Sequence, residues 1–163
     1  MSYSTEFIRH EETPPHLLDK IIAIKSCAWP YPYHSQLAWI ENNISSKDIH
    51  CLLLEENETI GYLNLVDISL SVNGKMLPGY GVGNVCSRHP GHGDGKRLIL
   101  AANEYIRNSG RAGFLFCKPQ LTGFYTKCGW SVIPNADFPS GINGMIYNSQ
   151  TPVTNFRYDG KVF

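Results

Sequence analysis

Three glycines at alternate positions are the first residues whose spacing bears on chemistry. Gly91, Gly93 and Gly95 lie between a stretch that predicts a strand and a stretch that predicts a helix. Glycine has no Cβ, so backbone N–H groups in such a turn can face a ligand. The following helix adds its unpaired N–H donors and the positive end of its dipole. This arrangement is typical of a phosphate or pyrophosphate site.

Two well-known phosphate loops do not fit this turn. Counting back from Lys96, the first glycine of a Walker A loop falls on Pro90, and its Ser/Thr position is Arg97. In a Rossmann loop the third glycine comes one residue later, and the loop follows the first strand instead of lying in mid-chain. Taken alone, the three glycines are explained equally well by a turn that binds nothing.

A second segment, Leu121–Trp130, follows the predicted helix and one short strand. Together the two segments resemble the GNAT superfamily of acyl-CoA-dependent N-acetyltransferases. In that family a strand ending in V-x-P-x-x-R-G-x-G-x-G opens a helix, and an aromatic-Tyr-x-x-x-Gly-aromatic segment follows. Within residues 82–133, the matching positions are Val85, the three glycines, Phe124-Tyr125 and Gly129-Trp130.

The match departs from the family pattern at three positions. Ser87 replaces the family's proline, and Pro90 replaces its arginine, which removes one N–H donor and one cation. Asp94 stands where an apolar residue is usual, and its negative charge beside a pyrophosphate would lower the affinity for the cofactor. The basic residues that can offset this charge are His92, Lys96 and Arg97.

The resemblance implies that acetyl-CoA is the cosubstrate and that its acetyl group passes directly to an amine. It assigns the pyrophosphate to the backbone of the glycine turn, at Gly91, His92, Gly93, Asp94, Gly95 and Lys96. It assigns the pantetheine to the backbone of the preceding strand, which splays from its neighbour, at Asn84, Val85 and Cys86.

Tyr125 matches the family's tyrosine that protonates the departing thiolate. A phenol with a pKa of about 10 is protonated at neutral pH and can hydrogen-bond to the thioester sulfur. From its local pattern alone, Tyr125 is better explained as a core residue of an amphipathic helix; the glycine turn upstream favours the catalytic role. Many relatives take their base from the strand before that turn, where this chain has no carboxylate. The open candidates for the base are Asp67, Asp137, Asp159 and a water relay.

The acceptor is expected near Trp29, Tyr31 and Tyr33, in a segment that the family places over its acceptor. Aromatic rings with polar tips suit a sugar or an amine-bearing ring, and the alternative is a loop packed on the core. The predicted acceptor is a primary amine of a small molecule. Alternatives are a protein amine and a non-catalytic acyl-CoA-binding domain. A fainter likeness to aminoglycoside 2′-N-acetyltransferases rests on Leu77–Tyr80, Gly129-Trp130 and Tyr158–Phe163.

The elements that must position these residues follow from the hydrophobic periodicity. A strand is predicted over Thr5–Arg9, and a helix enters at Thr13-Pro14-Pro15 and ends before Pro30. Asn73-Gly74 is a strong hairpin pattern. The other predicted elements are a helix over His34–Asn43, strands over Ile49–Glu55, Ile60–Val72 and Met76–Ser87, a helix over Lys96–Asn108, a strand over Phe114–Cys117, a helix over Leu121–Lys127, and strands over Trp130–Ile133, Gly144–Tyr147 and Val153–Tyr158.

These elements, with the resemblance, predict an α/β (α+β) fold: a GNAT-like mixed, mostly antiparallel central sheet, flanked by helices and splayed at the acyl-CoA site. The length of 163 residues fits one domain over 1–163. Fourteen basic and fourteen acidic side chains give a formal net charge of zero, which excludes a generally basic nucleic-acid binder. No apolar run is long enough to span a membrane, and the first twelve residues carry no signal-peptide core.

The five cysteines argue for a reducing, cytoplasmic compartment. They are odd in number and never form a CxxC pair, so neither a disulfide framework nor a zinc site is expected. The six histidines are scattered without HxH or HExxH spacing, and no metal is predicted. The resemblance also implies a homodimer, with no interface identified.

Overall fold

The computed structural model describes residues 2–134 and 136–163. Its sheet has the strand order β1-β2-β3-β4-β5-β7-β6, and β8 pairs with β3. β4 and β5 run parallel, whereas the other pairings with a described register are antiparallel. The predicted mixed, mostly antiparallel sheet flanked by helices is therefore confirmed.

The chain divides into two compact units. The first unit is Met1–Val66 with Gly83–Ala102, and the second unit is Asp67–Val82 with Asn103–Phe163. The sequence-based expectation of one domain over 1–163 stays a prediction. No helix in the described residues is long and apolar enough to cross a membrane.

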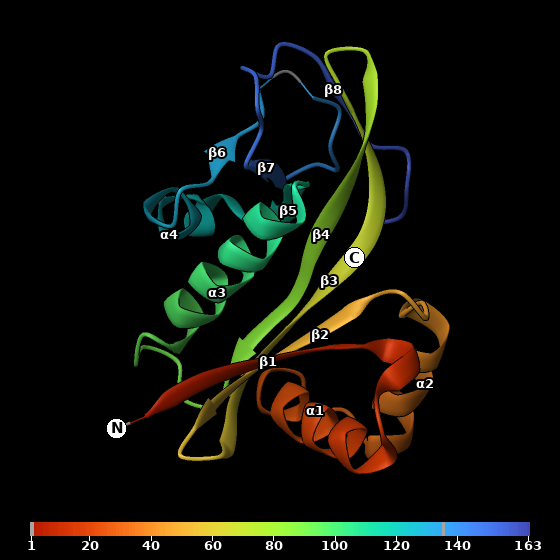
Figure 1. Ribbon diagram of the computed structural model, residues 1–163, viewed down its shortest axis with the longest axis vertical. Coiled ribbons are helices and arrows are strands. Elements are labelled where there is room, and N and C mark those ends of the chain that lie inside the picture. Colours follow the sequence, from red (N-terminus) through yellow and green to blue (C-terminus); the bar gives the residue numbers. More distant parts are fainter. Residues whose placement is uncertain (1, 135) are drawn as a thin grey trace. The chain divides into compact units, whose positions relative to one another are not determined.

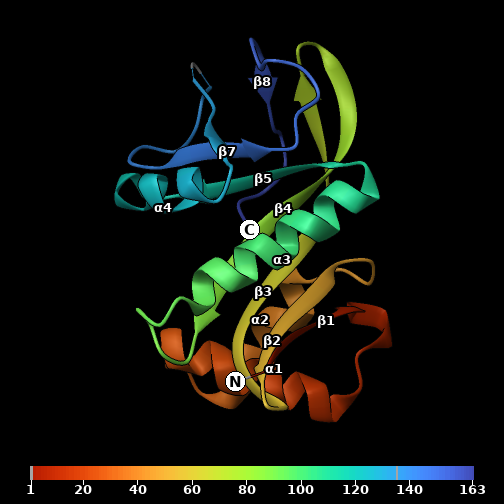
Figure 2. The ribbon, with the colours of Figure 1, turned by 60° about the vertical axis from the view of Figure 1, so that its left-hand side comes forward.

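The first unit packs two helices on strands. It contains β1 (Tyr3–Arg9), η1 (His10–Glu12), α1 (Pro15–Ala28), α2 (Tyr33–Asn43) and β2 (Ile49–Glu55), with parts of β3 (Glu58–Val72), β4 (Lys75–Ser87) and α3 (Asp94–Ser109). α1 begins at Pro15 because proline is tolerated in a first helical turn. Figures 1 and 2 show α1 and α2 side by side next to β1 and β2.

The core of the first unit lies between these helices and one face of the sheet. α1 buries three isoleucines at helical spacing, and β2 and β3 contribute alternate residues from one face. The buried members of this core are Ile21, Ile22, Ile24, Ile40, Ile44, Leu52, Leu54, Tyr62 and Cys86.

The second unit begins with the hairpin that the sequence predicts. Asn73 and Gly74 take positive φ values of 53° and 80°, as a two-residue type I′ turn requires, and join β3 to β4. The Asn73 side chain also accepts the backbone N–H groups of Thr154 (2.8 Å) and Asn155 (3.0 Å), which fastens the C-terminal segment to the hairpin. The remaining elements are β5 (Ala112–Cys117), η2 (Pro119–Leu121), α4 (Thr122–Lys127), β6 (Ser131–Val132), β7 (Asn143–Tyr147) and β8 (Phe156–Arg157).

Aromatic rings fill the core of the second unit. Phe114 is fully buried, and its ring contacts those of Phe116, Phe138, Phe156, Tyr158 and Phe163. The Phe163 ring lies directly on Gly81 of β4, where a Cβ would collide with it. Phe163 therefore packs against this core.

Most elements begin one or two residues away from their predicted starts, and two C-terminal strands are shorter than predicted. α3 begins at Asp94, two residues before the predicted Lys96, because an acidic residue is favourable in the first turn of a helix. The predicted strands over Trp130–Ile133 and Val153–Tyr158 shorten to Ser131–Val132 and Phe156–Arg157. At Thr154 and Asn155, bonds to the Asn73 side chain take the place of strand pairing.

Candidate functional site

The glycine turn leads into the N-terminus of α3. Gly91 and Gly93 have φ values of +89° and +84°, which non-glycine residues rarely adopt. The Gly93 carbonyl accepts the first helical hydrogen bond, from the Arg97 N–H at 3.1 Å. The N–H groups of Asp94, Gly95 and Lys96 therefore have no acceptor within the helix. This donor set fits an anion such as a pyrophosphate, as the sequence predicts for the turn.

Asp94, the residue with the unfavourable charge, is buried and paired. Its Oδ1 accepts a hydrogen bond from Arg97 Nη1 at 3.2 Å. The same guanidinium nitrogen bonds to the His92 carbonyl oxygen at 3.1 Å, and the guanidinium lies 4.1 Å above the Tyr3 ring. Arg97 is thus the neighbour that offsets the Asp94 carboxylate, and it braces the turn as well.

The end of β4 carries a backbone irregularity at a predicted pantetheine position. Asn84 has φ of +55° in mid-strand. Its Nδ2 donates to Oδ1 of the buried Asn64 on β3 at 2.9 Å. Val85 is half-buried, and Cys86 is buried in the core beneath α1. The positive φ of Asn84 thus falls at one of the positions where the family resemblance places the pantetheine.

The parallel pairing of β4 with β5 is short. It runs from Gly79–Ala112 to Gly81–Phe114. β4 then continues to Ser87 and β5 continues to Cys117. The described pairing of β4 with β5 thus ends before Asn84, Val85 and Cys86, the predicted pantetheine positions.

Tyr125 lies in α4 of the second unit and is 7% exposed. Burial, with the nearby Cys117 and Cys128 thiols, raises the pKa of Tyr125 to about 12. Its backbone carbonyl accepts the N–H groups of Cys128 and Trp130 at 3.0 and 3.1 Å, so the turn after α4 fixes its position. The raised pKa keeps the hydroxyl protonated at neutral pH, and no described side chain or carbonyl forms a hydrogen bond with it.

A buried bond network holds the segment after Tyr125. Trp130 Nε1 donates to Asn103 Oδ1 at 2.8 Å, and Asn103 Nδ2 donates to the Cys128 carbonyl at 2.7 Å. The Trp130 ring stacks on Tyr147 and lies against Gly113. In the aromatic-Tyr-x-x-x-Gly-aromatic pattern, Gly129-Trp130 therefore has a structural role. Tyr125 is the residue of the pattern whose hydroxyl is available for chemistry.

The three carboxylates considered as the base have ordinary structural environments. Asp67 pairs with Arg111 at 2.6 Å, and Asp159 pairs with Arg157 at 2.8 Å on the surface. Asp137 is exposed. None of the three is singled out as the base by burial or geometry.

The three predicted acceptor-binding aromatics lie at the junction of α1 and α2. Tyr31 and Tyr33 are exposed, and the Tyr33 hydroxyl donates to Asp19 at 2.6 Å, so this ring is held at the surface. Trp29 is half-buried against the core. Its carbonyl accepts a hydrogen bond from Nε2 of the buried Gln36 at 2.6 Å. The segment therefore includes both a surface part and a part packed on the core.

Two buried polar groups near this junction were missed in the sequence. Lys25, in the last turn of α1, is 3% exposed, and its Nζ lies 4.0 Å from the centre of the Trp39 ring. His50, on β2, is fully buried and bonds to the Tyr62 hydroxyl at 2.5 Å and to His10 Nδ1 at 3.0 Å. The residues next to Lys25 and His50 in the sequence do not indicate these contacts, because the partners lie on other helices and strands.

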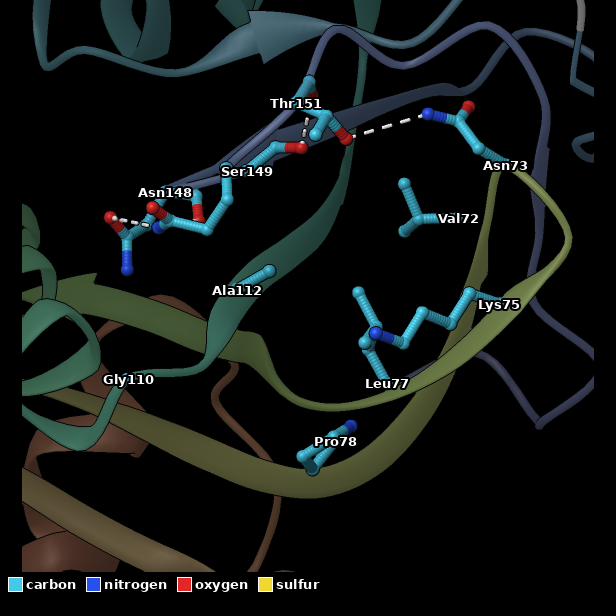
Figure 3. A pocket seen from close by; sticks show the side chains of 11 residues that line it. Val72, Asn73, Lys75, Leu77, Pro78, Gly110, Ala112, Asn148, Ser149 and Thr151 are labelled. Carbon is cyan, nitrogen blue, oxygen red and sulfur yellow. Dashed lines mark hydrogen bonds between the residues drawn. The ribbon is translucent and has the colours of Figure 1, made fainter.

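The second unit also contains a cavity of about 460 Å³. Figure 3 shows Lys75 and Leu77 of the hairpin on one side, and Ser149 and Thr151 on the other. The Ser149 hydroxyl donates to the Thr151 carbonyl at 2.6 Å. None of the residues that the sequence predicts for the site lines this cavity.

No protein-family model and no curated protein matches the chain. Solved structures do match its fold. Escherichia coli ElaA superposes with a TM-score of 0.67 at 15% identity, over 90% of this chain and 99% of that chain. An acyl-CoA N-acyltransferase from Pseudomonas aeruginosa gives a TM-score of 0.65 at 15% identity, with the same coverage of 90% and 99%. An aminoglycoside 6′-N-acetyltransferase complexed with coenzyme A gives 0.59 at 15% identity, over 86% and 95%.

These matches span most of the chain and nearly the whole length of the solved proteins. The protein therefore has the N-acyltransferase fold that the resemblance of its sequence to the GNAT superfamily implies.

Proposed function

We propose that this protein is an N-acetyltransferase that moves the acetyl group of acetyl-CoA to the primary amine of a small molecule. The observation that carries the proposal is the start of α3. In a chain with an N-acyltransferase fold, a turn with two positive-φ glycines presents three N–H groups that lack helical acceptors. The neighbours complexed with coenzyme A or described as acyl-CoA enzymes support the choice of cofactor.

Each part of the chain then has a role. The N–H groups of Asp94, Gly95 and Lys96 bind the pyrophosphate, and the backbone at Asn84, Val85 and Cys86 pairs with the pantetheine. Acetyl-CoA supplies the acetyl group as a reactive thioester. The neutral amine nitrogen bonds to the acetyl carbon as the carbon–sulfur bond breaks, and the nitrogen then loses a second proton to water to give the amide. The Tyr125 hydroxyl, protonated because its pKa is about 12, donates a hydrogen bond to the sulfur and stabilises the departing thiolate.

The acceptor amine must lose a proton before it attacks. The structure singles out none of Asp67, Asp137 and Asp159, so we assign this proton to water. The one-domain organisation, the cytoplasmic location and the homodimer remain predictions from the sequence.

Cofactor binding is tested first, by calorimetric titration with acetyl-CoA. We expect micromolar affinity for the native protein and about tenfold weaker binding for Gly91→Ala, one factor of ten being about 1.4 kcal/mol. Gly74→Ala is the matched control, because both glycines have φ near +80° to +90° and no atom within 4 Å of an added Cβ. A folded protein that binds no acetyl-CoA up to about 1 mM contradicts the proposal.

Turnover is tested with Tyr125→Phe. We expect kcat to fall by about 10²- to 10³-fold while the affinity for acetyl-CoA is unchanged. Tyr147→Phe, also in the second unit, is the control and keeps its activity. If Tyr125→Phe loses affinity at full turnover, the acid role is wrong. Binding without turnover on any amine identifies a non-catalytic acyl-CoA-binding domain, and turnover on peptides alone identifies a protein acceptor.

A further inference from the structure

The cavity of the second unit has an apolar wall large enough for the body of a small molecule. Its volume of about 460 Å³ lies within the range of about 300–1,000 Å³ that small-molecule sites in proteins occupy. Val72 and Ala112, which are 5% and 8% exposed, line it together with Leu77 and Pro78. Figure 3 shows Val72 and Leu77 of the hairpin on one side and Ala112 of β5 on the other. All of these residues belong to the second unit.

The segment that follows β7 forms the polar side of the cavity and is held at both ends. Asn148 has φ of +60°, and its Nδ2 donates to the Arg111 carbonyl at 2.9 Å. Asn73 Nδ2 donates to the Pro152 carbonyl at 2.9 Å and to Thr151 Oγ1 at 3.5 Å. These bonds fix the segment before a ligand arrives, which lowers the entropic cost of binding.

Lys75 gives the cavity its charge. Among the described residues that line the cavity, it is the one with an ionised side chain, and no carboxylate is among them. Figure 3 shows its side chain pointing from the hairpin into the space between the hairpin and β5. A cation beside an apolar wall, without an acidic residue in the lining, favours a ligand with an apolar body and a negative charge. One ammonium balances the single charge of a carboxylate, but not the nearly two charges of a phosphate monoester.

We propose that this cavity binds a small monocarboxylic acid with an apolar body. The apolar body packs on Val72, Leu77 and Ala112, and the carboxylate pairs with the Lys75 ammonium. None of the residues assigned to acetyl transfer lines the cavity, so the site is separate from the proposed function and does not rest on it. Because Lys75 is exposed, the ion pair raises the affinity by about fivefold, and salt weakens it.

Three probes with one carbon skeleton test the class of ligand: 3-phenylpropanoate, 3-phenylpropan-1-ol and 3-phenylpropan-1-amine. Each is titrated into the native protein without acetyl-CoA, and the amide NMR spectrum reports both the affinity and the place of binding. We expect 3-phenylpropanoate to bind with a Kd of about 1 mM or below, and about fivefold more tightly than the alcohol. The amide signals of Gly110 and of residues 149–151 should shift, whereas those of residues 91–96 in the glycine turn should not.

Substitutions of Lys75 separate the effect of its charge from that of the apolar wall. Lys75→Met should bind the acid and the alcohol equally well, and Lys75→Glu should prefer the amine. The Lys75 side chain is exposed, so both variants are expected to fold. Lys161→Met is the matched control, because Lys161 is an exposed lysine of the second unit that does not line the cavity, and it should keep the native preference.

Two kinds of result overturn the proposal. If about 10 mM 3-phenylpropanoate shifts no amide signal of the cavity lining, the cavity does not bind this class of ligand. If the native protein binds the acid and the alcohol equally, or if Lys75→Met keeps the preference for the acid, Lys75 does not select a carboxylate. Because these titrations contain no acetyl-CoA, their failure is distinguished from failure of the cofactor proposal.

Discussion

Acid is expected to destabilise this protein through His50. The ring is fully buried on β2, and its two nitrogens bond to Tyr62 and His10. Burial, with the charges of His10 and Lys25, lowers the pKa of His50 from 6.5 to about 3. Below pH 6.5 the unfolded chain binds a proton at this residue and the folded chain does not. The free energy of unfolding therefore falls as the pH drops from about 6.5 towards 3 and is unaffected by His50 above that range.

The size of the effect follows from the two pKa values. One pKa unit corresponds to about 1.36 kcal/mol, and integration between pH 6 and pH 4 gives a loss of about 2.5 kcal/mol from His50 alone. That is a large part of the 5–15 kcal/mol typical of a folded domain. Carboxylates add their own pH dependence, so the contribution of His50 is best obtained by difference.

The assay is urea unfolding followed by far-UV circular dichroism, from pH 4 to pH 7.5, on the native protein and on His50→Gln. At pH 7 the variant is less stable by about 1–2 kcal/mol, because one buried hydrogen bond or more is lost. Between pH 6 and pH 4 the variant loses about 2.5 kcal/mol less than the native protein. His16→Gln, an exposed histidine of α1, is the control and keeps the native slope. Equal slopes for His50→Gln and the native protein would refute the assigned pKa and its cause.

Two further outcomes follow from packing and from the glycine turn. An added Cβ at Gly113 lies 2.7 Å from the Trp130 ring. Gly113→Ala should therefore lower the free energy of urea unfolding by about 1–3 kcal/mol. The control is Gly123→Ala in α4, which has open space around an added Cβ and should not lower this free energy. Arg97→Gln leaves the Asp94 carboxylate without its partner and should weaken acetyl-CoA binding about tenfold in calorimetry. Adding Asp94→Asn to Arg97→Gln should restore affinity; if it does not, Arg97 acts on the cofactor directly.

Local patterns predicted most of the scaffold. Ile49–Glu55 is a strand with the predicted bounds, and the Asn73-Gly74 turn joins β3 to β4 as expected. These features depend on interactions between near neighbours, such as turn geometry and alternating burial. The glycine turn was predicted for the same reason, although α3 begins within it, at Asp94.

The polar interior could not be predicted in this way. His50 depends on His10, forty residues away, and Lys25 depends on Trp39 across two helices. A lysine that is one of many in a sequence is expected at the surface. Its burial becomes apparent only when α1, α2 and the sheet of the first unit are packed together.

The exposure of the five cysteines allows one of them to be labelled selectively. Cys27 is exposed, whereas Cys51, Cys86, Cys117 and Cys128 are buried. Alkylating reagents need an accessible thiolate, so a maleimide should attach a fluorophore at one defined position, two residues from Lys25. Replacing Cys27 by serine leaves a protein whose remaining thiols are shielded, and coenzyme A released during turnover can then be counted directly with a thiol-reactive dye.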